Sequence, residues 1–172
     1  MQLDLVLDAP VERVFAFLAD PENRPRWQSS LRRVELITGG AERSGAELVA
    51  EEGEGRPHSQ QEPPSSARAR QPTEPRLGTR WREQPIGLGW VELEIVRFER
   101  DRAWSERAEL AFGTFTLTLR FTPEGAATRV HVDAELALRG AARLLGPGVR
   151  LVLPRAFASD LRRAGRILAS ER

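Results

Sequence analysis

The feature that most restricts the fold of this chain is a regular alternation of apolar and polar residues over two long neighbouring segments, residues 113–123 and 127–138. Successive residues of a β-strand point to opposite faces of a sheet, so a period of two predicts strands with one buried face. Glu124-Gly125 separates the segments and is typical of a turn. The apolar positions are Phe115, Leu117, Leu119 and Phe121, then Val130, Val132, Ala134, Leu136 and Leu138. The two segments are therefore expected to form an antiparallel hairpin.

Three further strands are expected before this hairpin. They cover residues 78–84, 90–100 and 103–112, with a turn at 85–89, and the third has Trp104, Ala108, Leu110 and Phe112 in phase. In the second, Ile95 shares a face with Val91 and Leu93, whereas Val96 and Phe98 have the opposite parity, which indicates a bulge near Ile95-Val96. Since no helix separates these strands, the sheet is expected to be antiparallel.

The first 38 residues combine two strands with short helices. Leu3, Leu5 and Leu7 alternate with Gln2, Asp4 and Val6 and predict a strand, and Leu31 to Thr38 predicts another. Between them an apolar stripe of Val11, Val14, Phe15 and Leu18 indicates a helix that begins near Pro10 and ends at Asp20-Pro21. A second helical turn follows up to Trp27. Small helices are therefore expected between the first two strands.

The last part of the chain changes to a helical period after Gly140. Phe157, Leu161, Ala164 and Leu168 form one apolar stripe. Gly146-Pro147-Gly148 is expected to interrupt the first part, and Pro154 to open or kink the main helix. Such a helix needs an apolar surface to cover, and the sheet offers one. The expected fold class is α+β: a curved antiparallel sheet of about six or seven strands wrapped on a long C-terminal helix, with two short helices after strand one.

Residues 41–77 interrupt this pattern. They are rich in Glu, Gly, Pro, Ser and Arg, with almost no large apolar residue after Val49. Such a segment buries too little surface to offset its ordering entropy. For Ala46 to Glu51 a short strand and a short helix are both left as predictions. We expect residues 52–75 to be a disordered insertion in a single domain of residues 1–172, and favour solvated filler over a flexible lid.

Composition excludes several function classes. The 26 basic and 25 acidic residues are spread along the chain, so no basic patch for nucleic acid is visible. The absence of cysteine excludes disulfides and thiolate sites. The N-terminal residues are acidic, unlike a signal peptide, and no apolar run approaches the ~18 residues of a membrane helix. We expect a cytoplasmic protein, a monomer or homodimer, with no integral membrane association.

These segments together resemble the START-like (SRPBCC, helix-grip) superfamily, in particular its bacterial polyketide cyclase/dehydrase and lipid-transport branch. The residues that carry the resemblance are Ala9 to Phe15, Asp20-Pro21 through Trp27, Gly78 to Trp81, Gly113 to Phe115 with Thr128 to Val130, and the terminal helix. The resemblance implies a cavity between sheet and helix for lipids, polyketides or hormones. Its members include cyclases, carriers and regulatory binders, so the fold does not imply catalysis.

The expected pocket face is mostly apolar and contains tryptophans. An indole offers a large apolar surface and one N–H donor, which suits an aromatic or polycyclic ligand. Of the four tryptophans, Trp90 is the weakest candidate, and an ordinary core role remains open for the others. The ligand-binding candidates are Trp27, Trp81, Leu93, Ile95, Trp104, Phe112, Phe115, Leu117, Leu119, Val132, Phe157 and Leu161.

No catalytic constellation is recognisable. Glu83 shares parity with Trp81, so it is a weak candidate for an acid or base inside an apolar cavity, and Arg80 or Arg82 for orienting a ligand carbonyl. His58 is expected in solvent, and His131 on a polar strand face among charged neighbours. No cluster has metal-ligand spacing, and we expect no metal and no cofactor.

The function favoured by these observations is binding of a hydrophobic small molecule, lipid- or polyketide-like, without catalysis or with weak catalysis. One alternative is a polyketide cyclase/dehydrase-type enzyme that uses the same cavity to fold a reactive chain. Another is an interaction or stress-response module in which residues 41–77 bind a partner.

Overall fold

The computed structural model describes residues 1–37 and 74–171, without the side chains of residues 145–147 and 149–152. The strands are β1 Gln2–Leu7, β2 Leu31–Leu36, β3 Arg80–Pro85, β4 Val91–Glu99, β5 Ala103–Leu110, β6 Gly113–Glu124 and β7 Ala127–Leu138. The helices are α1 Val11–Ala19, η1 Pro21–Asn23, α2 Arg24–Trp27, η2 Gly140–Leu145 and α3 Gly146–Ser170, where η marks a 3₁₀ helix. The predictions for Thr38, His58, residues 46–51 and nearly all of the 52–75 insertion lie outside the described residues.

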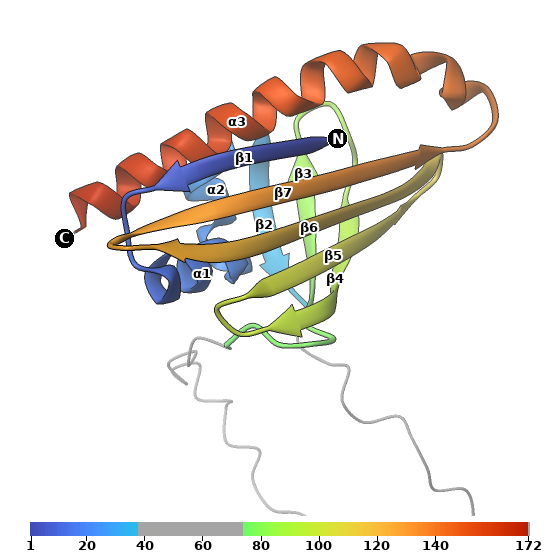
Figure 1. Ribbon diagram of the computed structural model, residues 1–172. Helices are drawn as coiled ribbons and strands as arrows, with labels where there is room; N and C mark the ends of the chain where they lie inside the picture. Colours follow the sequence, from blue (N-terminus) through green and yellow to red (C-terminus); the bar gives the residue numbers. More distant parts are fainter. Residues whose placement is uncertain (38–73, 172) are drawn as a thin grey trace, which may run out of the picture. The chain divides into compact units, whose positions relative to one another are not determined.

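The seven strands form one antiparallel sheet in the order β1-β7-β6-β5-β4-β3-β2 (Figure 1). Alternating residues pair in register across the central hairpin, as in Leu117 opposite Ala134 and Leu119 opposite Val132. In Figure 1 the strands β2 and β3 run across the direction of β1 and β7, so the sheet curves along its width. The antiparallel sheet predicted from the period of two is confirmed.

The bulge predicted near Ile95-Val96 is also confirmed. The pairing between β4 and β5 shifts register between Ile95 and Arg97. One extra residue reverses the alternation, so Phe98 returns to the inner face and packs against the core. Val96 lies at the bulge, between Ile95 and Arg97, and is 45% exposed.

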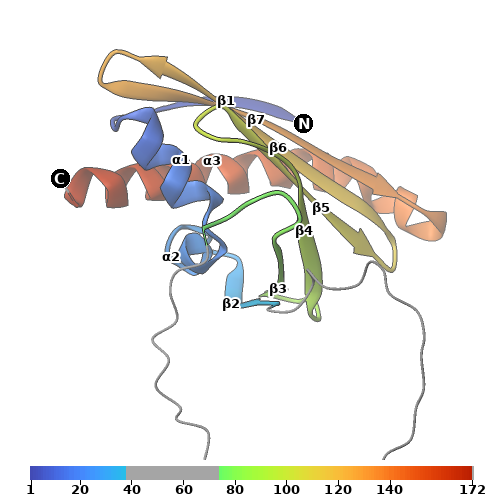
Figure 2. The same cartoon turned by 90° about the horizontal axis from the view of Figure 1, so that it is seen from below.

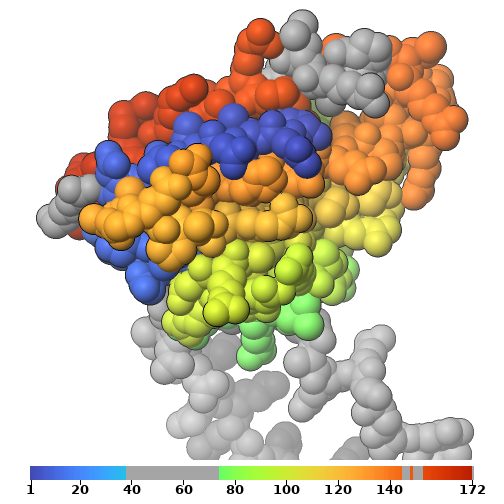
Figure 3. All heavy atoms as spheres, in the orientation of Figure 1, coloured from blue at the N-terminus to red at the C-terminus, as the bar shows by residue number. Residues whose placement is uncertain are grey.

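The long helix α3 packs against the sheet, and in Figure 3 its atoms (red) lie against those of β1 (blue). The predicted apolar stripe is buried at Leu161, Ala164 and Leu168. At the interruption expected at residues 146–148 the type of helix changes, because the 3₁₀ helix η2 ends at Leu145 and residues 146–148 form the first turn of α3. A proline in the first turn costs little, since the N–H it lacks has no partner within the helix there. Pro154 lies inside α3 and does not open it.

Helices α1 and α2 lie at the C-terminal end of α3 (Figure 2). Arg13 of α1 donates hydrogen bonds to the carbonyl oxygens of Leu168 and Glu171 at 3.4 and 3.3 Å. The last carbonyls of a helix have no partner within it, so a guanidinium there stabilises the helix end. The carboxylate of Asp160 on α3 accepts hydrogen bonds from Ser29 N and Oγ, at 3.0 and 2.8 Å, which joins α3 to the segment before β2.

The turn between β5 and β6 is tighter than the sequence pattern suggested. β5 ends at Leu110, so Phe112 lies in the turn rather than in the strand, which corrects the expected strand boundary. Gly113 follows it, and a Cβ at this position would lie 2.3 Å from the carbonyl oxygen of Ala137 on β7. The close approach of β6 to β7 at this position therefore requires glycine.

We expect Gly113→Ala to lower the free energy of unfolding by about 1–3 kcal/mol, because the obstructing atom is backbone and β7 must shift. Urea unfolding followed by tryptophan fluorescence would measure this. Gly89→Ala is the matched control, since a Cβ there meets no atom within 4 Å. Equal stability of the two variants would contradict the close approach.

Candidate functional site

The inner face of the sheet brings together most of the predicted ligand-binding residues in two apolar clusters. The larger cluster, which extends to α2 and α3, contains Trp27, Trp104, Leu117, Leu119, Val132 and Leu161, with Phe115 and Phe157 packed against it. The smaller contains Trp81, Leu93 and Ile95. Phe115 and Phe98 contact both clusters. Phe112 is half-buried in the β5–β6 turn, and the described residues of the two clusters do not include it.

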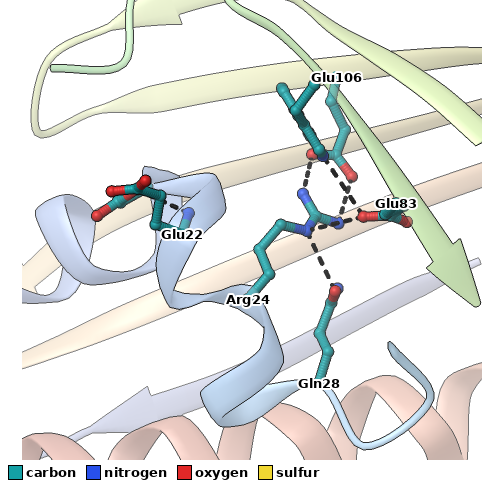
Figure 4. Close-up of polar contacts among 7 residues, drawn as sticks. Glu22, Arg24, Gln28, Glu83 and Glu106 are labelled. Atoms are coloured by element: carbon teal, nitrogen blue, oxygen red, sulfur yellow. Dashed lines mark hydrogen bonds and ion pairs between the residues drawn. The ribbon is translucent and has the colours of Figure 1, made fainter. Parts of the chain in front are cut away.

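A charged group, which we call the Arg24 cluster, lies inside this apolar interior and consists of Arg24, Gln28, Glu83 and Glu106 (Figure 4). The guanidinium of Arg24 on α2 makes a two-pronged contact with the carboxylate of Glu106 on β5. Nη2 donates to Oε1 at 2.9 Å and Nη1 donates to Oε2. Nε lies 3.1 Å from Gln28 Oε1 and 3.2 Å from Glu83 Oε2. One arginine therefore joins α2 to two strands of the sheet.

Trp81 supports this arrangement. The carbon centre of the Arg24 guanidinium lies 5.3 Å from the centre of the Trp81 ring, a cation–π geometry. The indole Nε1 of Trp81 donates to Glu83 Oε2 at 3.4 Å. Trp81 and Glu83 share the inner face of β3, as their parity predicted. The structure thus brings Glu83 into a buried polar group rather than into solvent at the end of the strand.

The cluster holds one guanidinium and two carboxylates, so its net charge is −1 when both carboxylates are ionised. Burial raises the pKa of the Glu106 carboxyl above its ordinary value of 4.5, and Arg24 offsets this only in part. Burial alone would lower the pKa of Arg24, but Glu106 and Glu83 outweigh it, and the pKa lies above its ordinary value. Arg24 therefore remains charged, and Glu106 retains a proton to higher pH than an exposed glutamate does.

This raised pKa predicts a pH dependence of stability. Between the unfolded and folded pKa values of Glu106 the folded chain holds a proton that the unfolded chain releases. The free energy of unfolding should therefore fall as pH rises through that window, by at most about 1.4 kcal/mol per pH unit. Urea unfolding between about pH 5 and pH 8 would compare the wild type with Glu106→Gln, which lacks this titration. Identical slopes in the two proteins would contradict the shift.

Two buried tryptophans carry an N–H donor without a partner. Trp27 and Trp104 are each 1% exposed, and neither indole Nε1 has a hydrogen-bond partner among the described residues. Trp27 follows Arg24 on α2 by three residues, and Trp104 precedes Glu106 by two on the inner face of β5. Because Arg24 and Glu106 are in contact, both donors belong to the elements that meet at this ion pair. Buried donors of this kind are rare and call for an explanation.

The other predicted polar residues lie away from this interior. Arg80 is on the opposite face of β3 from Glu83, where it is half exposed and lies 3.4 Å from Glu92 and 3.7 Å from Glu94. Arg82 shares that face and stacks on Trp90, which is 41% exposed. His131 Nδ1 lies 2.9 Å from Asp4 Oδ1 across the β1–β7 pair, on the polar face expected for it.

Sequence reasoning missed Arg24, Gln28 and Glu106. One signal was present, because Glu106 lies in phase with Trp104 and Ala108 on the apolar side of its strand. A carboxylate at a core-facing position requires a buried partner. No comparable signal marks Arg24, which is followed closely along the chain by Arg26 and Arg32.

Neither a spanning helix nor a metal cluster occurs in the described part of the chain. Within residues 1–37 and 74–171, no helix is long and apolar enough to cross a membrane. In the same residues, no three His, Asp or Glu side chains gather as metal ligands.

Comparison with known proteins places this chain in a family. The chain matches the polyketide cyclase / dehydrase and lipid transport family over residues 7–162, and it belongs to that family. No curated protein sequence matches it with significance. The family match confirms the resemblance inferred from the sequence.

Solved structures share the fold at low sequence identity. TTHA0849 from Thermus thermophilus superposes with a TM-score of 0.64 at 19% identity, covering 99% of this chain and 97% of that one. The di-domain ARO/CYC StfQ from the steffimycin biosynthetic pathway has a TM-score of 0.65 at 11% identity, covering 99% of this chain and 51% of StfQ. DynU16, from the dynemicin biosynthetic locus, has a TM-score of 0.60 at 14% identity, covering 100% of this chain and 48% of DynU16.

Proposed function

We propose that the chain binds a hydrophobic small molecule, lipid- or polyketide-like, between the sheet and α3. The observation that carries this proposal is the pair of buried indole N–H groups, of Trp27 and Trp104, that have no acceptor among the described residues. An unsatisfied buried donor costs about 1–3 kcal/mol. An apolar ligand with a carbonyl or hydroxyl oxygen would recover that free energy while it buries its own apolar surface. Membership of a family that includes lipid transport supports the same function.

The proposal is tested by native mass spectrometry of gently purified protein, which should retain an apolar small molecule. Trp104→Phe keeps an aromatic ring and removes the N–H, so it should weaken binding of a carbonyl-containing ligand. Trp90→Phe is the matched control, because Trp90 is exposed and stacks on Arg82, away from the buried interior. Protein that retains no apolar molecule and binds none when titrated would contradict the proposal.

A second candidate is a cyclase/dehydrase-type enzyme in the same interior. It is favoured by the Arg24 cluster, because a buried carboxyl whose pKa is raised can hold a proton for transfer. In this candidate Glu106 or Glu83 moves the proton and Arg24 holds the pair in place. Turnover of a poly-β-ketone substrate should then fall in Glu83→Gln and Glu106→Gln but not in Glu92→Gln, an exposed glutamate of β4. Unchanged turnover in both inner variants would remove this candidate.

The third candidate, an interaction or stress-response module, depends on residues 41–77. Most of these lie outside the described residues, so it stays a prediction. Deletion of residues 52–75 without loss of any binding partner would contradict it. The monomer or homodimer expected from the sequence also stays a prediction.

A further inference from the structure

We propose that Glu83 receives the polar end of the ligand, and that this end is a hydrogen-bond donor, a hydroxyl or an ammonium group, rather than a carboxylate or phosphate. This inference rests on the proposed function, since it concerns a ligand bound between the sheet and α3. It runs against the simplest interpretation of a buried arginine in a binding protein, which is recognition of an anion.

The first step is that Arg24 has no free edge for an anion. Its two terminal nitrogens contact the carboxylate of Glu106, and its Nε lies near both Gln28 and Glu83. The face of the guanidinium lies over the Trp81 ring. Each of the three nitrogens therefore already has an oxygen partner from this chain, and an incoming carboxylate could make a two-pronged contact only by displacing one of them.

The second step is that Glu83 does have a free edge. Both of its contacts, with Trp81 Nε1 and Arg24 Nε, use Oε2, and its Oε1 has no partner among the described residues. The Glu83 side chain is also the most accessible charged member of the cluster, 11% exposed against 3% for Arg24 and 0% for Glu106. The oxygen of an ionised carboxylate accepts hydrogen bonds and cannot donate them, so its partner must be a donor.

The third step concerns charge. Val34 on β2 and Val91 on β4 pair with Glu83 across the sheet, so its strand neighbours bring no positive charge. Arg24 is the one cation that contacts the two carboxylates among the described residues, which leaves one negative charge uncompensated when both carboxylates are ionised. A second anion would be repelled, an ammonium would complete the balance, and a hydroxyl would donate without adding charge. A hydroxyl oxygen would in addition accept from an indole N–H.

The test compares four ligands that share one apolar body. Naphthalene carrying a methyl, hydroxymethyl, aminomethyl or carboxylate substituent would be titrated into the full chain near neutral pH by equilibrium dialysis. We expect the aminomethyl and hydroxymethyl compounds to bind at least about tenfold more tightly than the carboxylate. Glu83→Gln should remove most of the advantage of the aminomethyl compound. Glu92→Gln, which removes an equal charge from the exposed face, should leave the ranking unchanged.

The outcomes separate this inference from the function on which it rests. A carboxylate that binds as tightly as the amine, or a Glu83→Gln protein that binds all four compounds as the wild type does, overturns the inference. If only methylnaphthalene binds, the inference fails while hydrophobic binding stands. If none of the four binds and no apolar molecule co-purifies, both fail. The ranking in the wild type needs no variant, so a folding defect in Glu83→Gln leaves the test decisive.

Discussion

Arg24→Met is expected to lower the free energy of unfolding by about 3–5 kcal/mol, because it leaves two buried carboxylates without their only contacting cation in the described residues. Methionine keeps the unbranched apolar stem of the side chain but removes the guanidinium, and with it the cation–π contact with Trp81, so the loss reports the missing cation more than lost volume. Glu106, whose pKa burial already raises, would then have to take up a proton on folding. The destabilisation should consequently be larger at pH 8 than at pH 5.

Urea unfolding with tryptophan fluorescence measures this effect, and two controls make it specific. Arg26→Met removes a neighbouring arginine whose side chain is 45% exposed and pairs with Glu171, so it should cost no more than about 1 kcal/mol. The triple variant Arg24→Met/Glu83→Gln/Glu106→Gln has no buried charge in the cluster and should recover part of the loss. An Arg24→Met protein as stable as Arg26→Met would show that burial of Glu83 and Glu106 does not depend on Arg24.

Leu161→Ala is expected to lower the free energy of unfolding by about 2–5 kcal/mol, because this side chain of α3 is 1% exposed and packs in the larger apolar cluster. The cost comes from lost burial and from the space left between helix and sheet. Arg162→Ala is the control, since Arg162 is exposed on the same helix and its substitution should change stability by no more than about 0.5 kcal/mol.

The Leu161→Ala variant also reports on the proposed binding face. If a ligand lies between the sheet and α3, an apolar ligand should recover part of the lost stability by filling the space, which would raise the thermal unfolding temperature of the variant more than that of Arg162→Ala. A loss of stability below about 1 kcal/mol would contradict the packing of α3 on the sheet.

The strands were predictable because their information is local. A period of two in residues 113–138 places every second side chain on one face whatever the rest of the chain does. The change of parity after Ile95 likewise located a bulge, since one extra residue is the simplest way to return Phe98 to the core. Prolines were less informative. The same residue type ends α1 at Asp20-Pro21 and lies inside α3 at Pro154.

The sequence by itself therefore determined the antiparallel sheet, the apolar face of α3 and the family, because periodicity and short motifs are properties of neighbouring residues. Only the tertiary structure decided that Arg24 meets Glu106, 82 residues away, and that Glu83 joins them. Nothing in the local pattern distinguishes Arg24 from the exposed Arg26. The difference arises because α2 turns one of these side chains toward the curved sheet, where a buried carboxylate needs a cation.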